Sequence, residues 1–391
     1  MLRVMEERKF YSKLCVARSL KSSVGKRCLN EFVPSGWDKL SYNLATILVK
    51  DKVVVAVNLR VLSNRCEISI AKDGVWLEED HKYVNKIKET LANISKDAPM
   101  TFKQTHSRED MIDLSSTILN YCSKIIRNRS DKLRKSITEN KDENYIKSFL
   151  EFVKTRINVD DIYNDEKIVS ISTVCCEWDH ALNLCLVSQI LYVKQNTHLF
   201  SHMDLQLLDP VVMIQPILPW NDIVKEFVDQ VEYGYLKEAC LKDSMIKRNL
   251  KHIYGGINVE LNCESSNEIY LHPILNILTS VMNHEEKRIF IAVSKRTCFL
   301  CDLYIRFVRD KGYNIIFSGS QKFYKKLYNR WKLPDRYKEE FMSFAQLELD
   351  QIIGNEIKYE LIYDSSDDEA LSMEYDEKEF ERFKNMPFIR L

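Results

Sequence analysis

The sequence contains little glycine or proline, no excess of either charge and no long hydrophobic run. Only 9 Gly and 8 Pro occur in 391 residues, 45% of which are hydrophobic, so the composition excludes a low-complexity protein and favours a helix-rich globular one. Lys and Arg number 57, and so do Asp and Glu, which argues against a protein that coats nucleic acid through bulk charge. The longest uncharged apolar run, residues 181–193, is too short and too polar to span a bilayer, so we expect no membrane contact.

Several common catalytic and targeting signals are also missing. The sequence lacks a Gly-rich phosphate loop, a Gly-x-Ser-x-Gly elbow and a His-Glu-x-x-His motif. It begins with the charged stretch MLRVMEERKF, which has no apolar core of a signal peptide. The 11 cysteines are odd in number and scattered, so we expect an intracellular protein, cytoplasmic or nuclear, in which most cysteines are small buried residues.

The length and the changes in pattern predict two domains. We expect a mostly helical N-terminal domain over 1–207 with a small β hairpin at about 52–71, and a connector over 208–220 that contains three prolines. Residues 221–345 then predict a second domain, and 346–391 a C-terminal segment with an acidic tail. Helical periodicity is expected at about 83–94, 111–125, 145–156, 167–195 and 221–250.

The second domain shows alternating strand and helix patterns. Strands are expected over 256–263, 288–293 and 313–318, separated by an apolar helix over 271–281 and by a second helix that carries Cys298 and Cys301. Ser294 or Thr297 is the expected cap of that second helix. The fold class predicted for the chain is therefore α+β, with an α/β domain at its C-terminal end.

One histidine and a Cys-x-x-Cys pair form the strongest chemical signal. His272 is followed, after 25 residues, by Cys298 and Cys301, and each group lies in the first turn of a predicted helix. Helices that start side by side would bring an imidazole and two thiolates together, which are three of the four ligands of a tetrahedral zinc ion. A zinc with one open position activates water, whereas Cys263 as a fourth ligand would make the site structural.

Two stretches of sequence resemble a known family. FIAVSKRTCFLCD at 290–302 and KLYNRWKLP at 326–334 are similar to motifs of the OTT-type nucleic acid/nucleotide deaminases, within the cytidine deaminase-like superfamily. The resemblance implies a deaminase-like α/β/α domain, a Zn²⁺ held by His272, Cys298 and Cys301, and deamination of a base by zinc-hydroxide attack. It covers roughly residues 255–335.

The sequence departs from that family at the position of the proton carrier. The family has a glutamate two residues after the metal-binding histidine, and Ile274 occupies that position here. Loss of a positioned acid/base typically costs about 10²–10⁴-fold in rate. Glu268 and Asp302 are the nearest acids in sequence, although neither is at the expected position. Two hypotheses follow: a zinc-dependent deaminase with impaired or altered proton transfer, and an inactive pseudoenzyme that serves as a zinc-stabilised binding module.

The region after the cysteines suggests where a substrate binds. Residues 322–332 interleave lysines and arginine with aromatic rings, the combination that binds single-stranded nucleic acid, and in the family this segment lies beside the pocket. Lys326, Tyr328 and Trp331 are the candidate contacts to a nucleotide or a single strand, while an amphipathic element with Trp331 packed inward is the alternative. The acidic tail over 364–381 is a candidate contact to protein partners.

Overall fold

The computed structural model describes most of the chain and shows a mixture of helices and sheets. The described residues are 2–25, 36–51, 53–97, 107–124, 201–256, 261–262, 265–282, 288–319 and 324–363, with isolated positions between 104 and 147. The helices expected over 145–156 and 167–195, Cys263 and the acidic tail lie outside these residues. The α+β class expected from the sequence therefore holds for the part of the chain that the structure describes.

A five-stranded sheet forms the centre of the fold, in the order β4-β3-β2-β7-β8. Its strands are β2 (Val55–Val61), β3 (Cys66–Lys72), β4 (Met203–Leu208), β7 (Ile289–Val293) and β8 (Ile315–Phe317). β2 pairs antiparallel with both β3 and β7, while β7 and β8 are parallel, as are β3 and β4. The hairpin of β2 and β3, expected to belong to a separate N-terminal domain, is thus in the same sheet as β7 and β8. These two strands follow the expected connector, residues 208–220, in the sequence.

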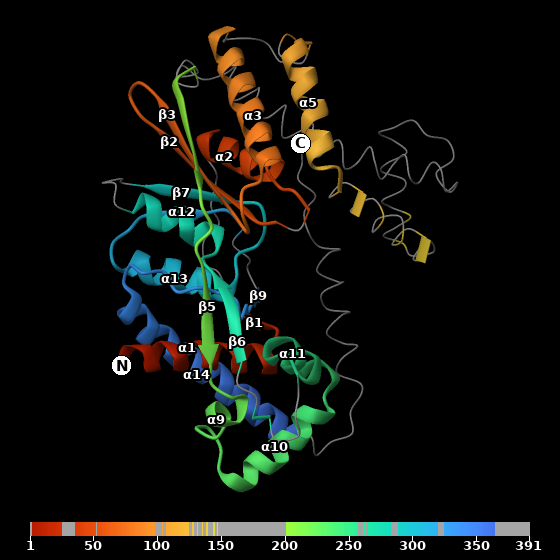
Figure 1. The fold of residues 1–391 in the computed structure, drawn as a ribbon, viewed down its shortest axis with the longest axis vertical. Coiled ribbons are helices and arrows are strands. Elements are labelled where there is room, and N and C mark those ends of the chain that lie inside the picture. The colour runs from red at the N-terminus through yellow and green to blue at the C-terminus, as the bar shows by residue number, and fades with distance from the viewer. Residues whose placement is uncertain are drawn as a thin grey trace.

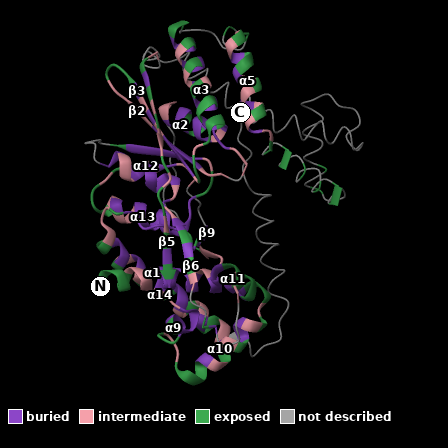
Figure 2. Cartoon of the chain, in the orientation of Figure 1, coloured by how far each residue is buried: buried purple, intermediate pink, exposed green. Residues whose placement is uncertain are grey.

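The two faces of this sheet belong to different hydrophobic clusters. On β7, Phe290 and Ala292 pack with α2 (Gly36–Ile47), α3 (Glu78–Asp97) and α5 (Glu109–Tyr121). Ile291 and its neighbours on the opposite face pack with α12 (Pro273–Val281) and α13 (Phe299–Asp310). Since successive side chains of a strand point to opposite faces, the uninterrupted apolar run of β7 serves both layers. The result is a helix–sheet–helix arrangement, in which β7 and α12 are among the most buried elements (Figure 2).

A second group of elements packs below α12 and α13 (Figure 1). Helix α1 (Leu2–Leu20) contacts α14 (Lys338–Tyr363), α11 (Ser244–Tyr254) and α9 (Trp220–Val224), and α10 (Gln230–Lys242) lies against α14. Two small antiparallel ladders complete this part of the fold. The first pairs β5 (Val212–Ile217) with β6 (Ser265–Tyr270), and the second pairs β1 (Ser23–Gly25) with β9 (Tyr324–Lys326).

Several elements differ from the expected boundaries. Residues 208–220, expected to be a connector, contain strand β5, and α14 runs without a break through position 345. The region expected as one helical segment over 221–250 is divided into α9, α10 and α11. Among the described residues, no helix is both long enough and apolar enough to cross a bilayer.

Candidate metal centre

Two helices begin next to each other and present the three candidate ligands. His272 is the N-cap of α12 with an extended backbone, and Pro273 occupies the first helical position, where its missing N–H costs nothing. Cys298 is the N-cap of α13, and its Sγ accepts a hydrogen bond from the backbone N–H of Cys301 at 3.4 Å. The cap expected at Ser294 or Thr297 is therefore wrong, because the first cysteine itself fills that position.

The ligand atoms converge on one point. His272 Nδ1 lies 3.5 Å from Cys298 Sγ and 3.3 Å from Cys301 Sγ, and all three atoms lie within 4.8 Å of one another. Both cysteines are buried. One imidazole and two thiols at this separation match the donor set and the spacing of a zinc site with one position left for a further ligand.

The charges of the three groups indicate a site adapted to a cation. Burial opposes ionisation of Cys298, but contacts with Cys301 and His272 hold the pKa of Cys298 well below its usual range. Burial and the neighbouring Cys298 raise the pKa of Cys301 well above its usual range. Burial lowers the pKa of His272, but the charge of Cys298 outweighs it and raises that pKa. A divalent cation bound between the two sulfurs would stabilise both of them as thiolates.

A carboxylate from a distant part of the sequence interacts electrostatically with this site, although it is not one of the clustered ligand atoms. Asp73 follows β3, and its charge affects the pKa of His272 and that of Cys301. Burial raises the pKa of Asp73, and the charge of His272 opposes that rise. Asp73 Oδ1 is buried and has no hydrogen-bond partner among the described residues, and the same is true of His272 Nε2. Sequence reasoning missed this acid, for which the only local signal was the Asp-Gly turn.

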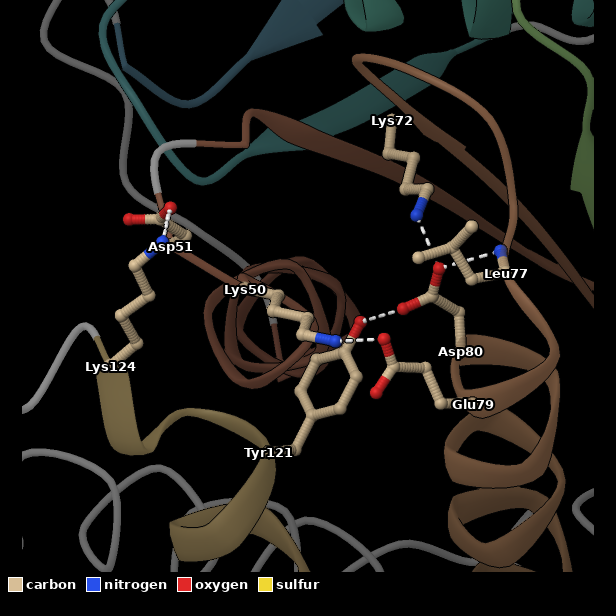
Figure 3. A network of polar contacts seen from close by, with 8 residues as sticks. All are labelled: Lys50, Asp51, Lys72, Leu77, Glu79, Asp80, Tyr121 and Lys124. Atoms are coloured by element: carbon tan, nitrogen blue, oxygen red, sulfur yellow. Dashed lines mark hydrogen bonds and ion pairs between the residues drawn. The ribbon is translucent and has the colours of Figure 1, made fainter.

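The turn that carries Asp73 is fixed at both ends by a buried polar network (Figure 3). Lys72 forms an ion pair with Asp80, whose carboxylate also accepts hydrogen bonds from the Leu77 backbone at 2.8 Å and from the Tyr121 hydroxyl at 2.7 Å. The backbone N–H of Asp73 donates to the Val54 carbonyl at 3.0 Å. These bonds hold residues 72–80 against the end of β2, next to β7 and the loop that leads to Cys298.

Gly319 packs against residues 295–297, the segment that leads to Cys298. Its φ is +82°, and a Cβ at this position would lie 2.8 Å from the Lys295 carbonyl oxygen. The Gly319 carbonyl accepts a hydrogen bond from the Thr297 backbone at 3.3 Å. A glycine is thus needed where the segment before Cys298 passes β8.

The other acids considered from the sequence do not serve the site. Glu268 is exposed on β6, on the side of the strand away from the buried Ile269. Asp302 is buried, but it pairs with Lys325 and, at 3.2 Å, with Arg306. Ile274, two residues after His272, is 3% exposed and belongs to the hydrophobic core, so this position offers no titratable group.

Two tyrosine rings flank the histidine. The Tyr270 ring lies 5.2 Å from the His272 ring and the Tyr328 ring 5.7 Å, measured between centroids. Tyr270 is held by backbone hydrogen bonds with Arg330 and Lys332, both 2.9 Å, which place the segment after β9 beside the ligands. Exposed aromatic faces at this place can stack on a planar base.

The three candidate substrate residues have different environments. Lys326 and Tyr328 line a cavity that opens beside the site. Trp331 has no exposed surface and packs against Phe10 and Phe341, with centroids 6.3 and 5.9 Å apart. The Trp331 indole nitrogen is buried and has no hydrogen-bond partner among the described residues. Trp331 thus lies in the hydrophobic core, whereas Tyr328 lines the cavity.

Comparison with curated proteins and with solved structures gives no match. The segment from the end of β6 through β9, which includes His272, Cys298 and Cys301, matches a family model. Residues 268–335 match the model of the OTT_1508-like deaminase family.

Proposed function

We propose that this chain is a zinc-dependent deaminase-like protein that acts on the bases of nucleotides or nucleic acids. The observation that carries the proposal is the convergence of His272 Nδ1 and the sulfurs of Cys298 and Cys301 within 4.8 Å, inside the segment that matches the deaminase family. These three residues would hold the zinc ion and leave a fourth position for the reactants.

The residues around the ligands fit the steps that such a reaction needs. Bound zinc would supply a Lewis acid that makes water nucleophilic toward the carbon bearing the exocyclic amine. Tyr270 and Tyr328 would hold the base by stacking beside His272. A carboxylate must then carry a proton to the leaving amine, and Ile274 has none to offer. We assign that role to Asp73, because its Oδ1 is buried without a hydrogen-bond partner among the described residues and its charge acts on His272.

The alternative is a pseudoenzyme, a zinc-stabilised module that binds its ligand without turning it over. The burial of Ile274 in the hydrophobic core favours this alternative, because the family position of the proton carrier is filled by an aliphatic side chain. The two hypotheses share the metal centre and differ only in whether Asp73 replaces the missing glutamate.

The test measures zinc content and deamination together. Zinc is quantified in the wild type and in Cys298→Ser. Deamination of cytosine and adenine, in free nucleotides and in single-stranded oligonucleotides, is assayed for both and for Asp73→Asn, Ile274→Glu and, as a matched control, Glu268→Gln. We expect one zinc per wild-type chain, turnover that Cys298→Ser abolishes, and a loss of about 10²–10⁴-fold in Asp73→Asn.

Each other result has a defined meaning. Turnover that appears only in Ile274→Glu would establish the pseudoenzyme. Equal losses in Asp73→Asn and Glu268→Gln would remove Asp73 from the mechanism. A wild type that retains no zinc would refute the proposed function.

A further inference from the structure

A cavity of about 450 Å³ lies beside the metal centre, between four segments that are far apart in the sequence. Its walls come from the end of α1, from α11, from the end of β6 and from the turn after β9. The pairing of Ser23 with Lys326 and the hydrogen bond from the Leu327 backbone to the Ser22 carbonyl, 3.2 Å, join α1 to that turn. Asn249 on α11 donates to the Ser19 carbonyl at 3.2 Å. The cavity is therefore part of the fold, and its volume suits a small organic ligand.

The cavity carries positive charge without any acid in its wall. Arg18, Lys326 and Arg330 line it together with His252, and none of the described residues that line it is acidic. The half-buried guanidinium of Arg18 donates to Ser22 Oγ at 3.4 Å, and among the described residues no carboxylate is paired with it. Guanidinium groups held without a carboxylate partner suit the oxygens of a phosphate.

The cavity and the metal centre share a wall. Tyr270 and Tyr328 line the cavity, and the same two rings lie 5.2 and 5.7 Å from the His272 ring. A bound molecule whose anionic group lies among the arginines and the lysine of the cavity can therefore place a planar ring next to the two tyrosines and close to His272.

We infer that this cavity binds the phosphate of the substrate, so that the protein recognises phosphorylated nucleosides and discriminates against free bases and nucleosides. The inference rests on the proposed function and deepens it. Two of the lining residues, Arg18 on α1 and His252 on α11, lie outside the segment that matches the deaminase family, so this recognition depends on parts of the fold beyond that segment. The phosphate can belong to a free nucleotide or to a single strand, since both offer the same oxygens.

The experiment compares ligands that differ only in the phosphate. Binding of cytidine and adenosine, of their 5′-monophosphates and of a single-stranded oligonucleotide is measured by calorimetry on the full-length zinc-loaded protein. The variants are Arg18→Gln and, because Arg18 is half-buried, Arg330→Gln in the exposed turn. Arg248→Gln is the matched control, because Arg248 is an exposed residue of α11 that does not line the cavity.

We expect each monophosphate to bind at least about tenfold more tightly than its nucleoside, in keeping with a charge-assisted hydrogen bond. This preference should fall by about tenfold in Arg18→Gln and Arg330→Gln and remain in Arg248→Gln, with zinc content unchanged in all three. An oligonucleotide that binds more tightly than a monophosphate, with a steep dependence on salt, identifies a strand as the source of the phosphate; equal or weaker binding identifies a free nucleotide.

Equal affinity for nucleoside and monophosphate, or equal effects of Arg18→Gln and Arg248→Gln, would overturn the inference and leave the zinc site untouched. A protein without zinc would refute the proposed function, and the inference with it. The two failures are therefore distinguished by the zinc content alone.

Discussion

Replacement of Lys72 by methionine tests the network that fixes the Asp73 turn. Asp80 has no exposed side-chain surface, and only 9% of the Lys72 side chain is exposed. Removing one partner of a buried pair typically costs about 3–5 kcal/mol, because the other charge stays buried without compensation. Asp80 retains the hydrogen bonds from Leu77 and Tyr121, so we expect a loss near the lower end, about 3 kcal/mol of unfolding free energy. Urea denaturation followed by circular dichroism measures it.

The control is a pair on the same helix that is open to solvent. Lys82 and Glu78 are 3.5 Å apart with side chains 75% and 80% exposed, so Lys82→Met should change stability by no more than about 0.5 kcal/mol. The double variant Lys72→Met/Asp80→Asn should lose less than the sum of its single variants, because both remove the same interaction. A loss in Lys72→Met as small as that in Lys82→Met would refute the reasoning.

The same pair predicts a dependence on pH, and two further changes test the site. Burial raises the pKa of Asp80, but the hydrogen bonds to its carboxylate outweigh burial and lower that pKa below the ordinary value of 3.8. The ionised Asp80 therefore stabilises the fold at pH values above 3.8, and this stabilisation is lost as the pH falls through the pKa of the folded state. In denaturation curves, the difference in stability between wild type and Lys72→Met should shrink below about pH 4. Gly319→Ala should destabilise by about 1–3 kcal/mol and weaken zinc retention, while Gly354→Ala, which has open space on α14, should stabilise by about 0.5–1 kcal/mol. Chelation of zinc should lower the melting temperature of the wild type and leave that of Cys301→Ser unchanged, as scanning calorimetry would show.

The ligand positions were predictable because their signal is local. A histidine before a proline and a Cys-x-x-Cys pair each mark the first turn of a helix, and the structure places both at helix N-termini, at His272 and Cys298. The strand between them, β7, was predicted from a short apolar run that is buried on both faces. The spacing of these residues along the chain was therefore sufficient to predict which side chains form the candidate metal centre.

The rest of the fold depends on pairings that no local pattern reveals. Val57 lies opposite Ala292, a pairing between residues more than 200 positions apart, so the hairpin could not be assigned to the sheet from its own sequence. Helix α1 escaped detection because polar residues occupy buried positions on it. Ser12 and Ser19 are fully buried, and they accept hydrogen bonds from the Leu218 backbone and from the Trp220 indole at 2.7 and 3.0 Å. Those partners are also distant in sequence.

The segments outside the family match determine how this centre differs from the family pattern. Residues 268–335 contain the three candidate ligands, whereas the proposed proton carrier Asp73 and the most enclosed cation of the cavity, Arg18, lie outside that segment. Asp73 follows β3, which pairs with β2 and through it is joined to β7, and Arg18 comes shortly before β1, which pairs with β9. Under the proposed function, a chain with Ile274 at this position needs an acid from elsewhere in the fold. The pairing of β2 with β7 is therefore as necessary to the proposed chemistry as the cysteines are.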